Sequence, residues 1–283
     1  LADELQRRGS AETYFAFFET HPAAPAEELN SLRWMAAGGC RRVHRVDRAT
    51  PESWAELAAA WRRRPTWWFG VLGYDLKNAF EPTLPPRGEA WHGMPDVAMW
   101  EPEWVLECRS DGTVVEHGDA QAWLKQSAHL NESTTQQQAQ WSVSWSAPDY
   151  LERAESLRLH LHRGDIYEVN LCVDSEAKGE RDLGRLFAKL REQTEAGMGG
   201  MIRWGDFSVA SASPERYVKV APDGKIYSQP IKGTASRGRD FEADAAAAAE
   251  LRFAEKEQAE NIMIVDLVRH DFSRVASKGS VAV

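Results

Sequence analysis

The spacing of apolar side chains predicts four helices. They cover residues 53–61, 151–161, 183–190 and 240–260. The second repeats apolar residues at the helical period, and it follows Ser146 and Asp149, whose three-residue spacing is typical of a helix N-terminus. Gly164 follows it and is a good C-terminal cap. The fourth combines an alanine run with charged flanks, which predicts a solvated helix with a small packing face.

Alternating or continuous apolar positions predict strands between these helices. They cover residues 66–74, 97–108, 113–116, 166–173 and several stretches between 201 and 229. The stretches of this last group are separated by the turn residues Gly205-Asp206 and Pro222-Asp223-Gly224. In the fourth, Tyr167 and Val169 alternate with Glu168 and Asn170, which is typical of a strand with one core face and one polar face. The turn residues Asp111-Gly112 predict a hairpin between the second and third strands.

Residues 125–148 are rich in Gln, Ser and Thr and lack apolar periodicity, which is typical of a linker. We therefore expect two domains, an N-terminal α+β domain at residues 1–130 and a second domain at residues 146–283. The mixture of predicted helices and strands places the whole chain in the α+β class.

Composition excludes several functional classes. Among the 283 residues, 34 Lys and Arg against 43 Asp and Glu leave a net charge of −9, which argues against a broad nucleic-acid-binding surface. No stretch approaches the roughly 18–20 apolar residues of a membrane span, so the expected compartment is the cytoplasm. Cys40, Cys108 and Cys172 lie far apart and form no CxxC pair, so neither a disulfide framework nor a thiolate zinc site is indicated.

Four segments place polar groups within strongly apolar sequence. They are residues 164–170, 211–217, 229–234 and 260–271. The last is expected to bury residues 262–265 and to set a carboxylate at each end. One such segment is most simply a satisfied ion pair, but four within a short stretch of chain favour a polar pocket.

Four motifs carry a resemblance to a known family. They read GDIYEVN from residue 164, SPERY from 213, PIKGTASRG from 230 and ENIMIVDLVRHDFSRVA from 260. In this order and spacing they resemble the catalytic-domain motifs of the chorismate-utilising enzymes and, within them, of the synthase components of aminodeoxychorismate synthases. Residues 68–81 resemble the family's N-terminal domain. The resemblance implies an α+β fold of layered sheets and helices, with residues 146–283 as the N-terminal part of the chorismate-binding catalytic domain and its C-terminal part absent.

The resemblance also implies roles for five residues. Glu215 would be the general acid that protonates the departing C4 hydroxyl of chorismate. Lys232 would be the covalent nucleophile, a step that needs its unprotonated amine. Gly233 and Thr234 would donate hydrogen bonds to a substrate carboxylate, and Glu260 would be a ligand of Mg²⁺.

The implied reaction is the amination of chorismate to 4-amino-4-deoxychorismate for para-aminobenzoate and folate synthesis. Ammonia would come from a separate glutamine amidotransferase, since the chain contains no GxCxG-type nucleophile. The resemblance leaves two alternatives. Anthranilate synthases usually carry alanine at the position of Lys232, so this residue discriminates between the two amination products. A chorismate-binding or regulatory module without catalysis is the other alternative. Glu168 stands where water-adding relatives carry a lysine base, which argues against isochorismate synthesis.

Overall fold

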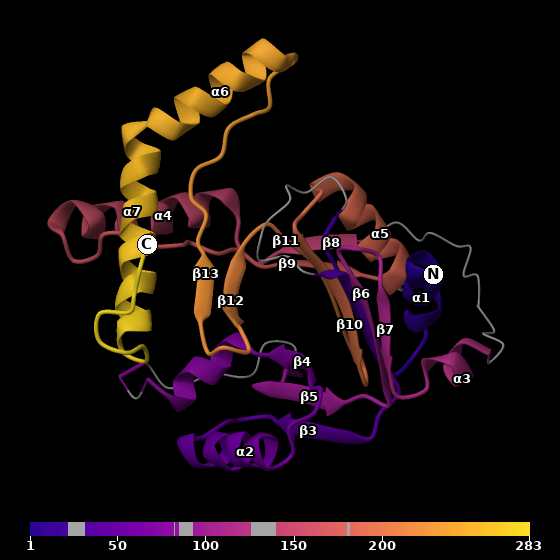
Figure 1. Cartoon of the computed structure of the whole chain (residues 1–283). Coiled ribbons are helices and arrows are strands. Elements are labelled where there is room, and N and C mark those ends of the chain that lie inside the picture. Colours follow the sequence, from indigo (N-terminus) through magenta and orange to yellow (C-terminus); the bar gives the residue numbers. More distant parts are fainter. Residues whose placement is uncertain (22–31, 82, 85–92, 126–139, 180–181) are drawn as a thin grey trace. The chain divides into compact units, whose positions relative to one another are not determined.

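The computed structural model describes residues 1–21, 32–81, 83–84, 93–125, 140–179 and 182–283 (Figure 1). The chain forms two compact units, residues 1–128 together with 183–283, and residues 129–182. This grouping differs from the division at residues 130–146 expected from the sequence, which stays a prediction. No helix among the described residues is long and apolar enough to cross a membrane.

A six-stranded antiparallel sheet forms the centre of the larger unit. In spatial order its strands are β11 (Phe207–Ser213), β10 (Met198–Trp204), β1 (Tyr14–Glu19), β2 (Leu32–Gly38), β6 (Trp104–Arg109) and β7 (Val114–His117). One interior pairing joins β1 to β10 in the register Phe17 to Met201. Strands from the first and the second half of the chain therefore share one sheet.

A second antiparallel sheet has the order β3 (Arg42–Val46), β5 (Val97–Glu101) and β4 (Phe69–Leu72). Helix α2 (Pro51–Arg63) and the 3-10 helix η1 (Tyr74–Ala79) pack with it, through a buried cluster that includes Leu57, Leu76 and Val97. Helix α2 begins at a capping box in which Thr50 and Ser53 bond each other's backbone amides, as expected of a helix in this region.

Alternate residues of β1 face opposite sides of the six-stranded sheet. Phe15 and Phe17 pack in a buried cluster that includes residues of α1 (Ala2–Gly9), α3 (Ala120–Lys125) and α5 (Leu183–Thr194). Ala16 packs on the other side, in a cluster that includes Phe69 and Trp100 of the three-stranded sheet. The six-stranded sheet thus lies between a layer of helices and a second sheet, and it buries apolar side chains on both faces.

The rest of the larger unit carries three of the four motifs, since residues 164–170 belong to the smaller unit. After β11 the chain forms the hairpin of β12 (Arg216–Val220) and β13 (Ile226–Gln229), followed by α6 (Phe241–Phe253) and α7 (Glu255–Ser273). Asp240 caps α6, since its Oδ1 accepts a hydrogen bond from the amide of Ala243. Neither helix buries a side chain, so the solvated helix predicted for residues 240–260 is confirmed, although a break at Ala254 divides it in two.

The smaller unit contains α4 (Ala147–Arg163) and the antiparallel pair of β8 (Gln140–Val143) and β9 (Ser175–Lys178). Helix α4 has the predicted termini: Ser146 and Asp149 form a capping box, and Gly164 ends the helix with a positive φ of 75°. The strand predicted for residues 166–173 is wrong. Those residues form no strand, and Tyr167 is 57% exposed. The two strands described in this unit pair with each other, and neither pairs with residues 166–173.

Two further strand predictions need correction. The strand predicted for residues 97–108 is two strands, β5 and β6, which belong to different sheets. The strand predicted for residues 66–74 is confined to β4, and Tyr74 beyond it is 83% exposed. The hairpin predicted at Asp111-Gly112 is confirmed by the pairing of β6 with β7.

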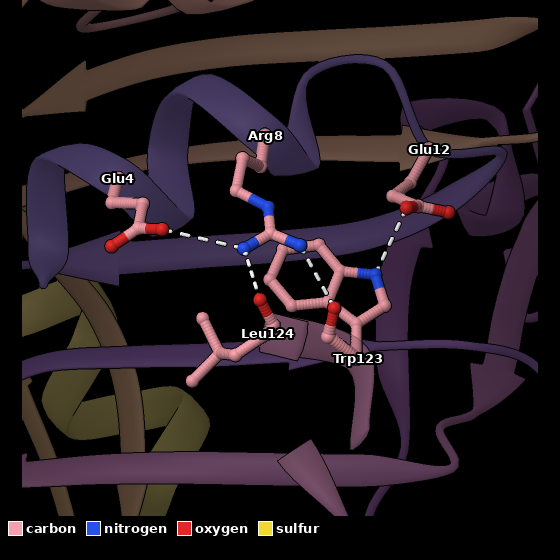
Figure 2. A network of polar contacts seen from close by, with 5 residues as sticks. All are labelled: Glu4, Arg8, Glu12, Trp123 and Leu124. Atoms are coloured by element: carbon pink, nitrogen blue, oxygen red, sulfur yellow. Dashed lines mark hydrogen bonds and ion pairs between the residues drawn. The ribbon is translucent and has the colours of Figure 1, made fainter. Parts of the chain in front are cut away.

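Arg8 joins α1 to the C-terminal end of α3 (Figure 2). Its guanidinium donates hydrogen bonds to the carbonyl oxygens of Leu124 at 2.7 Å and Trp123 at 2.8 Å, and it lies 4.6 Å from the centre of the Trp123 ring. The indole Nε1 of Trp123 donates to Glu12 Oε1 at 2.9 Å. Because the last carbonyls of a helix have no partners within it, this cation satisfies groups that α3 itself leaves open.

We predict that Arg8→Gln lowers the free energy of unfolding by about 2 kcal/mol, because it removes charged hydrogen bonds from two poorly solvated carbonyls. Arg7→Gln is the matched control, since Arg7 lies on the same helix and is exposed. Urea unfolding followed by tryptophan fluorescence measures both changes. Equal stability of the two variants would contradict the assignment of Arg8 as a link between the helices.

Candidate functional site

The β12–β13 hairpin brings two of the four motifs together. The turn residues Pro222-Asp223-Gly224 reverse the chain, and the strand register then places Arg216 opposite Gln229. Arg216 Nε donates to Gln229 Oε1 at 2.8 Å. Because these are the first residue of β12 and the last of β13, the segments just outside the hairpin, at residues 213–215 and 230–234, lie side by side.

Glu215 lies in the tight turn between β11 and β12. The hydroxyl of Ser213 donates to the carbonyl oxygen of Glu215 at 2.9 Å and accepts from the Glu215 amide at 3.2 Å, which fixes the turn. The carboxylate Oε1 of Glu215 accepts a long hydrogen bond, 3.4 Å, from the amide of Ile231. The predicted general acid is therefore exposed and adjacent to the residue that precedes Lys232.

Lys232, Gly233 and Thr234 belong to a segment without helix or strand, between β13 and α6. Lys232 is half-buried and Thr234 is exposed. Gly233 has a positive φ of 80°, and a β-carbon there would lie only 2.7 Å from Glu257 Oε2. The segment thus passes close to the first turn of α7, in a conformation and at a distance that suit glycine.

Glu260 lies one turn further along α7. Its Oε1 is 3.3 Å from Lys256 Nζ, which is also 3.5 Å from Glu257 Oε1. The hydrogen bond that Lys256 donates to Glu260, and then the charge of Glu257, raise the pKa of Lys256. The sequence interpretation singled out Glu260 and missed Glu257, although their three-residue spacing within a helix is the signal that they share one face.

The donor set at the start of α7 fits a magnesium ion in part. Glu257 and Glu260 supply hard carboxylate oxygens, and the ammonium of Lys256 already lies beside both. Within the described ranges, no group of three or more His, Cys, Asp or Glu side chains is arranged to hold a metal ion. Mg²⁺ binds through one or two protein carboxylates and retains several waters, so a pair of carboxylates suits it.

The apolar run that follows Glu260 is less buried than the sequence led us to expect. Residues 262–265 lie within α7, where Ile262 is 68% exposed and the other three residues are half-buried. Glu168 belongs to the smaller unit, which is described by itself.

A cavity of about 530 Å³ lies along the six-stranded sheet. Its walls include Trp34, Met198 and three charged side chains, Glu19, Arg216 and Lys219. Burial raises the pKa of the Glu19 carboxyl, although Arg191 Nε lies 2.6 Å from Glu19 Oε1 and opposes the shift. The cavity does not include the five residues predicted for the site, although it shares β12 with them.

Three kinds of similarity relate the chain to known proteins. The chorismate binding enzyme family profile matches residues 17–283. Aminodeoxychorismate synthase component 1 of Klebsiella aerogenes is 36% identical over 220 residues, which are 76% of this chain and 48% of that protein. Anthranilate synthase component 1 of Thermus thermophilus is 30% identical over 240 residues, which are 77% of this chain and 51% of that protein. The chain thus spans about half the length of the curated relatives it matches.

The fold is similar to that of a solved enzyme. The crystal structure of anthranilate synthase component I from Streptococcus pneumoniae superposes with a TM-score of 0.71 at 17% identity, and the match covers 90% of this chain and 64% of that one. The predicted α+β fold of layered sheets and helices is therefore confirmed.

Proposed function

Since the chain belongs to the chorismate-binding enzyme family, we propose that the protein carrying it aminates chorismate to 4-amino-4-deoxychorismate. One observation carries the proposal. Lys232 lies in a loop, and the amide of Ile231, the residue before it, donates a hydrogen bond to the carboxylate of Glu215. The backbone next to Lys232 thus lies beside Glu215, and an amine and a carboxylic acid that meet at one substrate can form a bond to carbon while they protonate the group that leaves. The sequence identity of 36% with aminodeoxychorismate synthase component 1 of Klebsiella aerogenes supports this choice of product.

The reaction proceeds in two displacements. In the first, the neutral amine of Lys232 bonds to the chorismate ring while the C4–O bond breaks, and Glu215 supplies the proton with which the hydroxyl leaves as water. The lysine nitrogen then returns its extra proton to the Glu215 carboxylate. In the second, ammonia bonds to C4, the bond from the ring to the lysine nitrogen breaks, and the amine is regenerated with one of the protons of the ammonia.

The remaining site residues bind and orient the substrate. The amide of Gly233 and the hydroxyl of Thr234 are donors that suit a substrate carboxylate. Glu257 and Glu260 would hold Mg²⁺, which when bound supplies positive charge to a carboxylate of chorismate. The half-buried position of Lys232 limits the water that competes with its amine.

The ammonia would come from a separate glutamine amidotransferase. A chain that aminates the ring with free ammonia needs only a path by which ammonia reaches C4. Glutamine can then be hydrolysed on a separate protein. The relatives are component 1 of their synthases, which supports a two-component arrangement.

We predict that the protein carrying this sequence converts chorismate, in the presence of Mg²⁺ and ammonium, to 4-amino-4-deoxychorismate. Liquid chromatography with mass detection identifies the product. Anthranilate as the main product would assign the protein to the anthranilate synthases. Absence of turnover by folded protein would favour a non-catalytic chorismate-binding module.

Lys232→Ala should lower kcat by about two orders of magnitude or more, because the covalent step loses its nucleophile. Lys232→Arg should be equally inactive, since arginine keeps the charge but has no nucleophilic amine. Lys225→Ala is the matched control, because Lys225 is an exposed lysine in the turn of the same hairpin and pairs only locally, with Asp223 at 3.1 Å. Amination at the wild-type rate by Lys232→Ala would refute the nucleophile assignment.

Glu260→Gln should weaken Mg²⁺ binding by about tenfold or more, because it removes one of two carboxylate ligands. Isothermal titration of the protein with Mg²⁺ measures this independently of activity. Glu250→Gln, an exposed acid on α6, provides the control for a general loss of negative charge. An unchanged affinity in Glu260→Gln would exclude Glu260 as a ligand.

A further inference from the structure

The loop that carries Lys232 is not held by the backbone hydrogen bonds of a helix or a sheet. Residues 230–239 form neither helix nor strand, between the end of β13 and Asp240, the cap of α6. Such a segment holds one conformation only if side chains or close packing attach it to its neighbours. The contacts that do so lie on α6 and α7.

The strongest attachment joins Arg237 to Asp244. Arg237 Nε lies 2.6 Å from Asp244 Oδ1, and Arg237 Nη2 lies 2.7 Å from Asp244 Oδ2, which is a two-pronged ion pair. The amide of Gly238 donates to the same Oδ1 at 2.9 Å. One carboxylate in the first turn of α6 therefore accepts three hydrogen bonds from two consecutive loop residues. These bonds, the side-chain bond from Arg237 above all, lower the pKa of Asp244 to about 2.

That low pKa sets the pH range over which the ion pair of Arg237 with Asp244 persists. A carboxyl whose folded pKa lies below its ordinary value of 3.8 contributes its stabilisation above that value and loses it as the pH falls towards 2. The pair is therefore fully charged throughout the neutral and mildly acidic range.

Close packing reinforces the ion pair. A β-carbon at Gly238 would collide with the backbone nitrogen of Asp244, so the loop and the helix touch backbone to backbone. At the other side of the motif, a β-carbon at Gly233 would lie 2.7 Å from Glu257 Oε2 and 3.3 Å from Leu251 Cδ1. At Gly233, beside Lys232, the loop thus packs against α7 and the end of α6. At Gly238 it packs against the start of α6.

We propose that Arg237 and Asp244 are a positioning pair, which holds the loop of residues 230–238 on α6 and thereby sets the position of Lys232 beside Glu215. This inference rests on the function proposed for Lys232. Neither partner touches the reacting atoms: Arg237 acts through Asp244 and through the loop between them. Because the Arg237 side chain is largely exposed, the pairing contributes little to overall stability, but a displacement of about 1 Å at a reacting group can lower a rate by about a hundredfold.

The test compares Arg237→Gln with Arg158→Gln in the protein carrying this sequence. Arg158 is a matched control, because it forms an equally two-pronged pair with Glu155 on α4, at 2.7 and 2.8 Å, and it carries no loop. The measurements are hydrogen exchange of the segment 230–240, the rate at which an amine-selective reagent labels Lys232, kcat and KM for chorismate, and the melting temperature.

Arg237→Gln should raise hydrogen exchange at the Gly238 amide and label Lys232 several-fold faster, because the half-buried amine becomes more exposed when the loop loosens. It should lower kcat by 10- to 100-fold, change KM by less than threefold and leave the melting temperature unchanged. Arg158→Gln should resemble the wild type in all of these. Asp244→Asn should lower kcat to a similar extent, and the double variant Arg237→Gln/Asp244→Asn should add little to either, as expected of two residues that act as a unit.

Two outcomes would overturn the proposal. Unchanged exchange and labelling in Arg237→Gln would show that the pair does not hold the loop. Raised exchange with unchanged kcat would show that the attachment does not position Lys232. If wild-type protein does not aminate chorismate, the proposed function fails, whereas exchange and labelling still decide whether Arg237 and Asp244 hold the loop.

Discussion

The structure depends on the antiparallel pairing of β1 with β10. These strands are separated by more than half of the chain, yet they are neighbours inside the six-stranded sheet and align Phe17 with Met201, both fully buried. The pairing brings the first strand of the sequence to the stretch from which β11, the Glu215 turn, β12 and β13 follow. The segments that carry Glu215, Lys232 and Glu260 all follow β10 along the chain, and this pairing holds β10 in the sheet.

The division between core and site follows from that arrangement. Most buried side chains are apolar or aromatic, and two of the three buried clusters lie on the two faces of the six-stranded sheet. The residues with chemistry lie outside both faces, in the Glu215 turn, in the loop of residues 230–238 and on the first turns of α7. Reactive groups on loops are held by local contacts instead of by the core. The contacts of Asp244 and Glu257 with the loop are of this kind.

Local features could be predicted from the sequence, and features set by distant contacts could not. The capping box at Ser146 and Asp149 and the turns at Asp111-Gly112 and Pro222-Asp223-Gly224 depend on a few neighbouring residues, and the structure has helices and hairpins at these places. The alternation at 166–173 also looked like a strand, but a strand needs a partner, and none of the described strands pairs with it. For the same reason the β1–β10 pairing could not be read from the spacing of apolar residues. In the site, the hairpin turn between the SPERY and PIKGT motifs was predictable, whereas the contact of Arg237 with Asp244 joins a loop to a helix and has no periodic signal.

The central claim is that Lys232 becomes bonded to the substrate. Rapid acid quenching of the protein with chorismate and Mg²⁺, without ammonium, followed by intact-protein and peptide mass spectrometry, tests it most directly. The account predicts a mass increase of one chorismate less one water, because the amine loses a proton and the ring loses its hydroxyl, and it places that increase on the peptide that contains Lys232. Chorismate amination by protein that shows no adduct, or an adduct on a different residue, would contradict it.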